Sequence, residues 1–155
     1  MPRRLPARRT CATAVVGLLA LSGCSKPTPG VTLVSGKKSV HTEASNYCGG
    51  RILTAVTDCV KRSKPTVLET RQGDQVGIDV DRALTKRGWF VIDLDSNTRY
   101  SYQDTHYLAF DADFTNRPLP GVINLEVREV EHRPSSDKDL SPVIGIWRFQ
   151  LLQKN

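Results

Sequence analysis

The chain has 155 residues, of which 25% are charged, and its 22 basic and 16 acidic side chains give a formal net charge of +6. Four of the basic residues and none of the acidic ones precede Cys24, so the chain from Cys24 onward has 18 basic and 16 acidic residues and a net charge of +2. This small excess excludes the strongly basic surface of a nucleic-acid-binding protein, and we expect no partner of that class.

Residues 1–23 have the parts of a bacterial secretory signal peptide. A positive segment holds two Arg pairs, and Cys11 to Leu21 form an apolar run of eleven residues. This run is shorter than the roughly 20 residues that a membrane-spanning helix needs. The run ends in Leu21-Ser22-Gly23-Cys24, which is typical of a lipoprotein processing site. We expect a diacylglyceryl group on the Cys24 sulfur and cleavage of the chain just before this residue.

A lipidated Cys24 would place the protein at the extracytoplasmic face of the cell membrane, with membrane lipid as a partner. Each buried methylene contributes about 0.8 kcal/mol, and two acyl chains suffice for stable anchoring. Two alternatives stay open. The leader can be an ordinary signal peptide in which Cys24 is incidental, and the Arg pairs leave twin-arginine export open beside general secretion.

The chain after the leader divides into a spacer, residues 24–30, and one domain, residues 31–155. The spacer contains two prolines and no apolar side chain to bury, which favours an extended conformation. From Val31 onward the apolar residues recur with period two, in short runs separated by turn residues. This pattern predicts an all-β fold, an Ig-like or cupredoxin-like antiparallel β-sandwich of about seven or eight strands with one short helix.

The strands are expected where the period-two runs lie, and the turns where Gly, Asn or Asp interrupts them. The predicted strands are Val31 to Val34, Ser39 to Ala44, Thr66 to Arg71, Gln75 to Val80, Trp89 to Leu94, Thr105 to Phe110, Val122 to Val130 and Val143 to Leu152. The predicted turns are Ser35-Gly36-Lys37, Gln72-Gly73-Asp74 and Asp95-Ser96-Asn97. Trp89 and Trp147 stand in apolar strands and are expected in the core. Arg51 to Arg62 has helical spacing instead, and we expect the short helix there.

The folded domain has two cysteines, Cys48 and Cys59, because Cys11 and Cys24 belong to the leader and the anchor. Outside the cytoplasm such a pair is expected to form a disulfide, which would stabilise the domain by roughly 3 kcal/mol. A catalytic or metal-binding pair is the alternative, but no Cys-x-x-Cys spacing supports it.

Aspartates at spacing two are candidates for a metal site, although the pattern departs from a calcium loop. Three pairs occur, and the residues that come closest to calcium-loop positions are Asp93, Asp95, Asn97 and Asp104. Thr98 stands where such a loop needs Gly, and capped turns explain the pairs without an ion. His41, His106 and His132 are separated in the predicted fold, and the sequence lacks the free Cys and axial Met of a blue-copper site. We therefore expect no cofactor.

Two further features are candidates for recognition. Tyr100 and Tyr102 follow a polar turn and are the aromatic residues most expected at the surface. The long loop from Asp111 to Gly121 is stiffened by Pro118 and Pro120, as binding loops often are. A plain connection is the alternative for this loop. Because no catalytic motif is present, we do not expect an enzyme.

Several segments together resemble small secreted lipoproteins of actinomycetes that carry a single domain of unknown function. The resemblance rests on Cys-Ser-Lys-Pro-Thr-Pro at Cys24, Ser-Val-His-Thr-Glu-Ala-Ser from Ser39, Tyr47-Cys48, Cys59, Gly73-Asp74-Gln75-Val76 and Trp89. It implies a lipid-anchored envelope protein with a disulfide framework and no assigned activity. The sequence thus favours a non-catalytic binding or accessory module of the cell envelope, whose partner is an envelope protein or a small ligand. A metal-binding module, for calcium, copper or zinc, is the alternative.

Overall fold

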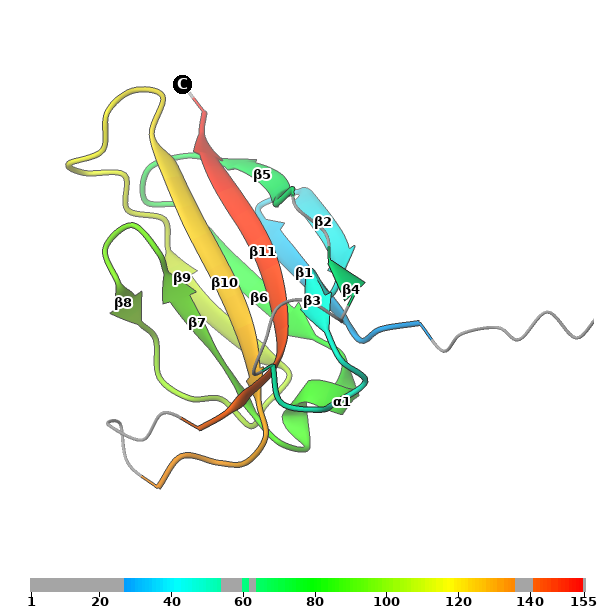
Figure 1. Ribbon diagram of the computed structural model, residues 1–155. Coiled ribbons are helices and arrows are strands. Elements are labelled where there is room, and N and C mark those ends of the chain that lie inside the picture. The colour runs from blue at the N-terminus through cyan, green and yellow to red at the C-terminus, as the bar shows by residue number, and fades with distance from the viewer. Residues whose placement is uncertain (1–26, 54–59, 62–63, 136–140, 155) are drawn as a thin grey trace, which may run out of the picture.

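The computed structural model describes residues 27–53, 60–61, 64–135 and 141–154. These residues form two sheets packed face to face, so the predicted β-sandwich is confirmed (Figure 1). One sheet has the order β2–β1–β6–β9, with strands Lys38–Glu43, Gly30–Ser35, Gln75–Val80 and Tyr107–Asp111. The other has the order β4–β3–β11–β10–β7–β8, with strands Val60–Lys61, Asn46–Tyr47, Val143–Gln153, Val122–Val130, Trp89–Asp93 and Thr98–Arg99, and β5, Thr66–Thr70, also pairs with β11.

All eight predicted strands are present, within two residues of their expected bounds. The turns also lie where the sequence places them, because Gly36, Gly73 and Asn97 adopt positive φ angles of 57°, 76° and 55°. Such angles favour Gly and Asn over other residues. The short strands β3, β4 and β8 were not predicted, because two residues are too few to establish a period.

The core lies between the sheets and is formed by the period-two faces. Val76 and Ile78 of β6 are fully buried, and Trp89 and Trp147 face them from the other sheet without solvent exposure. Each indole is also fixed by a hydrogen bond, from Trp89 Nε1 to the Thr105 carbonyl at 2.8 Å and from Trp147 Nε1 to the Pro29 carbonyl at 2.9 Å. The prediction that both tryptophans belong to the core is confirmed.

One strand pair departs from the predicted antiparallel arrangement. β5 runs parallel to the last residues of β11, from Phe149↔Thr66 to Gln153↔Thr70, while β3 pairs with the first residues of the same edge of β11. β5 also contacts the opposite sheet, because Thr70 shares a hydrogen bond with Ser35 and Glu69 pairs with Lys38. β5 therefore closes one side of the sandwich.

The prediction of a helix from Arg51 to Arg62 is wrong for those of its residues that the structure describes. Residues 51–53 are irregular, and Val60–Lys61 form β4, which pairs with Asn46 and Tyr47. Pairing with a neighbouring edge strand outweighs the weak helical spacing, and β-branched Val60 suits a strand. Residues 54–59 lie outside the described part. The helix that the structure describes is α1, Arg82–Thr85, a single turn that buries Leu84.

The chain enters the sandwich at the end opposite the Asp111–Gly121 loop (Figure 1). Gly30, at the start of β1, exchanges hydrogen bonds with Asp81, whereas Ser35, at the other end of β1, pairs with Val76. The described end of the predicted spacer already lies against the domain, because Thr28 accepts a hydrogen bond from Ala44 and Pro29 from Trp147. In the described part of the chain, no helix is both long and apolar enough for a bilayer span.

Candidate functional site

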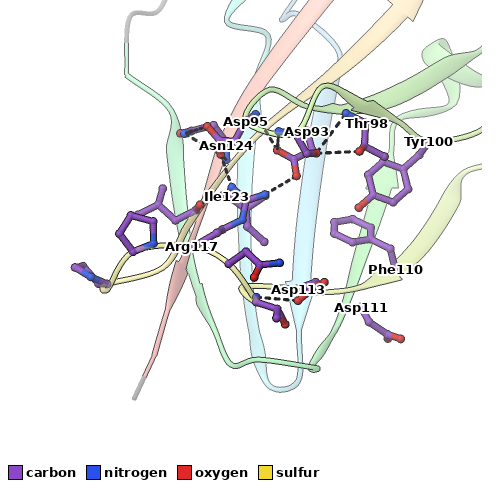
Figure 2. A pocket seen from close by; sticks show the side chains of 16 residues that line it. Asp93, Asp95, Thr98, Tyr100, Phe110, Asp111, Asp113, Arg117, Ile123 and Asn124 are labelled. Carbon is purple, nitrogen blue, oxygen red and sulfur yellow. Dashed lines mark hydrogen bonds and ion pairs between the residues drawn. The ribbon is translucent and has the colours of Figure 1, made fainter.

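A pocket of about 710 Å³ opens at the loop end of the sandwich (Figure 2). Its lining residues come from three segments, residues 93–100 from the end of β7 to just past β8, residues 110–120 from the end of β9 into the following loop, and residues 122–124 at the start of β10. The pocket therefore spans both sheets. It lies between the strand ends and the Asp111–Gly121 loop, which the sequence singled out as a candidate binding loop.

Arg117 joins this loop to the sheet. Its guanidinium binds the carboxylate of Asp93 at 2.6 Å and that of Asp95 at 2.7 Å, and it donates to the Val122 carbonyl at 2.8 Å. Asn124 donates to Asp95 from both its backbone and its side chain. The side chain of Arg117 is only 17% exposed. The positive charge is thus neutralised by two carboxylates of the β7–β8 turn.

The turn also fixes these two carboxylates locally. Asp93 Oδ1 accepts hydrogen bonds from the backbone N–H groups of Asp95 and Ser96, as an aspartate that caps a turn does. Partial burial by itself would raise the pKa of Asp95, but hydrogen bonds from Asn124 and the charge of Arg117 outweigh it, and the pKa lies below its ordinary value. Asp95 therefore stays ionised and holds Arg117 at neutral pH.

The other wall carries two carboxylates without an ion pair in the described part of the chain. Asp111 ends β9, and Asp113 follows two residues later; both are exposed. Asp113 accepts hydrogen bonds from Thr115 N at 2.9 Å and from Gln72 Nε2 at 3.1 Å. These bonds, those from Thr115 foremost, lower its pKa to about 2. The Asp113 carboxylate is consequently charged at any physiological pH.

An aromatic pair lines the pocket between the two acidic groups (Figure 2). The rings of Tyr100 and Phe110 lie 4.9 Å apart with a tilt of 40°, and both side chains are partly buried against the core. Burial, and next the negative charge of Asp93, raise the pKa of the Tyr100 hydroxyl. Tyr100 therefore remains a neutral hydrogen-bonding group beside the apolar ring of Phe110.

The four calcium-loop candidates do not converge on one point. Asp93 and Asp95 bind Arg117, Asn97 occupies the positive-φ turn position, and Asp104 lies 3.7 Å from Arg133. Within the described ranges, no group of three or more His, Cys, Asp or Glu side chains is arranged to hold a metal ion. The calcium-loop spacing in the sequence is misleading because the β7–β8 hairpin reverses the chain before Asp104. Asp104 therefore lies beyond the hairpin, away from the other three residues.

The other predicted candidates lie outside the pocket. His41 contacts Thr32, His106 contacts the Val80 carbonyl, and His132 lies beside Glu131. Tyr102 donates to the Arg87 carbonyl. Cys48 does not carry a free thiol, and Cys59 lies outside the described residues, so the pairing of these two cysteines stays a prediction.

The structure brings together features that the sequence presented separately, and it adds two residues. The pairs Asp93/Asp95 and Asp111/Asp113, the proline-stiffened loop and Tyr100 all line one pocket. Arg117 and Asn124, which connect them, were not predicted. Their carboxylate partners are 22 to 29 residues away, so no short spacing reveals them. Searches for similar proteins found no matching family model, curated protein or solved structure.

Proposed function

We propose that this protein is a lipid-anchored, extracytoplasmic binding module of the cell envelope, and that the pocket at the loop end of the sandwich is its binding site. The anchor is the part that the sequence supports, through the Leu21-Ser22-Gly23-Cys24 tetrad. The binding role is supported by the pocket itself. A concave site with a few converging polar groups and an aromatic wall is the usual form of a small-molecule site.

The observation that carries the proposal is the placement of the pocket relative to the point of chain entry. Gly30 adjoins Asp81 at one end of β6, whereas Asp111, on the pocket wall, pairs with Gln75 at the other end. A domain tethered through the chain before Gly30 would thus carry the pocket on its far end, open to the surroundings. This arrangement suits capture of a ligand from the envelope space.

The pocket supports binding better than catalysis. Arg117, its cationic group, is fully engaged with Asp93, Asp95 and the Val122 carbonyl. The pKa of Asp113 is about 2, which makes this carboxylate a poor general base at neutral pH. The rigid, charged walls can hold and orient a ligand without changing its covalent structure.

The anchor is tested by expressing the full chain in a bacterial host with a lipoprotein pathway and separating membranes from soluble proteins. The natural protein should be found in the membrane fraction, with the mass of residues 24–155 plus a diacylglyceryl adduct, because the two acyl chains hold it there. The matched variant Cys24→Ser should not yield this processed, lipid-carrying form. A free thiol at Cys24 in mature, exported protein would overturn the anchoring proposal.

The binding role needs its own measurement. Photo-crosslinking groups can be placed at Asn116, on the pocket loop, and at Arg82, on α1. Both positions are exposed, but only Asn116 lines the pocket. If the pocket binds an envelope component, the group at Asn116 should give a specific adduct in intact cells that the group at Arg82 does not. Identical adducts from both positions, or adducts from neither, would overturn the binding role.

A further inference from the structure

The walls of the pocket carry an excess of negative charge. Its lining residues include four carboxylates, Asp93, Asp95, Asp111 and Asp113, and one guanidinium, Arg117, for a formal charge of −3. The chain from Cys24 onward has a formal charge of +2, so the pocket is opposite in sign to the protein as a whole. Clefts lined by one sign of charge concentrate ligands of the other sign.

The two acidic groups have different surroundings. Arg117 binds both Asp93 and Asp95, so these three side chains keep one net negative charge and the guanidinium is already occupied. Asp111 and Asp113 form no ion pair with any described side chain, and hydrogen bonds from Thr115 and Gln72 keep Asp113 charged. An anionic ligand would meet two unpaired carboxylates and an occupied arginine, which disfavours phosphates and carboxylic acids.

The aromatic pair adds a second requirement that is independent of the carboxylates. Tyr100 and Phe110 line the same pocket as Asp111 and Asp113; the charge of Asp113 acts on Tyr100, whereas the Asp111 side chain is directed away from the rings (Figure 2). Aromatic rings attract organic cations through the negative charge of their faces and also cover apolar groups. A strongly hydrated inorganic ion gains little from such a wall, whereas an alkylated ammonium group gains from both the rings and the carboxylates.

We propose that the pocket binds an organic ammonium ligand, with the positive nitrogen beside the Asp113 carboxylate, its alkyl part against Tyr100 and Phe110, and Asp111 adding negative charge at the edge of the pocket. This inference rests on the proposed binding role and adds the chemical class of the ligand. The Arg117 network has a structural role in this proposal, because it holds the loop that carries Asp113 against the β7–β8 turn. The ligand is recognised by charge and by apolar contact together.

The test is calorimetric titration of the full-length protein, solubilised in a neutral detergent, with choline and with the uncharged analogue in which carbon replaces the choline nitrogen. Choline should bind, and its uncharged analogue should bind at least about tenfold more weakly. The affinity for choline should fall as salt is added, because the carboxylates are exposed. The D111N/D113N double variant should weaken choline binding about tenfold.

Two controls distinguish the effect of removing charge at the pocket from the effect of removing charge elsewhere and from loss of folding. Asp79→Asn removes an exposed carboxylate of β6 near the end that adjoins Asp81, away from the pocket, and should leave choline affinity unchanged. Tyr100→Leu should weaken choline by about threefold while the thermal midpoint confirms a folded domain. Equal binding of choline and the uncharged analogue, or unchanged affinity in D111N/D113N, would overturn the ammonium ligand.

The remaining outcomes also decide between the two proposals. Tighter binding of calcium chloride than of choline, lost in D111N/D113N, would show an inorganic cation site and would overturn the ligand class. Absence of choline binding at millimolar concentration would overturn it as well. In either case the crosslinking comparison between Asn116 and Arg82 still decides separately whether the pocket binds an envelope component.

Discussion

Glu129 places a carboxyl group on the core-facing side of β10, on the same strand face as Leu125 and Val127. It is only 3% exposed, and its Oε2 atom has no hydrogen-bond partner among the described residues. Burial raises the pKa of Glu129 to about 7, although the nearby positive charge of Arg87 opposes this shift. Its charge in turn contributes to the raised pKa of Tyr47, after burial. A buried acid of this kind makes the stability of the protein depend on pH.

The sign of this dependence follows from the two protonation equilibria. The folded protein holds the Glu129 proton up to about pH 7, whereas the unfolded chain releases it near its ordinary pKa of 4.5. The stability that protonated Glu129 contributes is therefore complete below about pH 4.5 and is lost as the pH rises to about 7. The loss is on the order of 3 kcal/mol.

Glu129→Gln should remove this loss, because an amide stays neutral at every pH. Between pH 5 and pH 8, urea unfolding should show the natural protein losing stability relative to the variant, by about 2 to 3 kcal/mol. Glu131→Gln, at an exposed position two residues further on, is the matched control and should follow the natural protein. Parallel pH profiles for the natural protein and Glu129→Gln would contradict the assignment.

At the scale of elements, one side chain attaches a long loop to the sandwich. The Asp111–Gly121 loop connects β9 in one sheet with β10 in the other, and Arg117 fastens its middle to Asp93 at the end of β7. The Asp93 side chain is only 10% exposed, and Arg117 balances its charge, beside the two backbone hydrogen bonds from Asp95 and Ser96. Removing one member of a largely buried ion pair leaves the other charge uncompensated.

Arg117→Met should therefore destabilise the domain by about 3 kcal/mol and loosen the pocket wall. The free energy of unfolding in denaturant gives the first quantity, and hydrogen exchange of the loop amides gives the second. Combining the substitution with Asp93→Asn should recover part of the loss, since the amide removes the uncompensated charge. Arg133→Met is the control, because that side chain is 74% exposed. A loss no larger than that of the control would refute the fastening role.

For the whole molecule, the arrangement of the chain entry and the pocket has a consequence for orientation at a membrane. α1 follows Asp81, which holds Gly30, so Arg82 lies at the entry end, and Asn116 lies on the opposite loop. A protein anchored before Gly30 keeps the entry end nearer the lipid, since only the short segment from Cys24 separates the two.

If Cys24 carries the proposed lipid, this orientation can be measured with fluorophores attached to Arg82→Cys and Asn116→Cys in the protein bound to vesicles that contain headgroup-quencher lipids. The label at position 82 should be quenched more strongly than the label at position 116, because quenching falls steeply with distance. The corresponding proteins that also carry Cys24→Ser should show little quenching at either position. Stronger quenching at position 116 would mean that the pocket faces the membrane.

The sequence by itself determined the eight longer strands, the three predicted turns and the core. Alternation of apolar residues in Val76, Ile78 and Val80 is a local signal, and the positive φ at Gly36 and Gly73 is a local property of the backbone. Burying one face of each strand is enough to produce a sandwich, so these features could be predicted without knowledge of any long-range contact.

Only the tertiary structure decided the site, together with the parallel pairing of β5 and the strand at Val60. The sequence presented Asp93/Asp95, Asp111/Asp113 and Tyr100 as separate features and suggested a calcium loop for some of them. The fold instead turns the first pair toward Arg117 and leaves the second unpaired on the facing wall. The physical reason is that these contacts join residues more than twenty positions apart, and their geometry is fixed by how the two sheets pack.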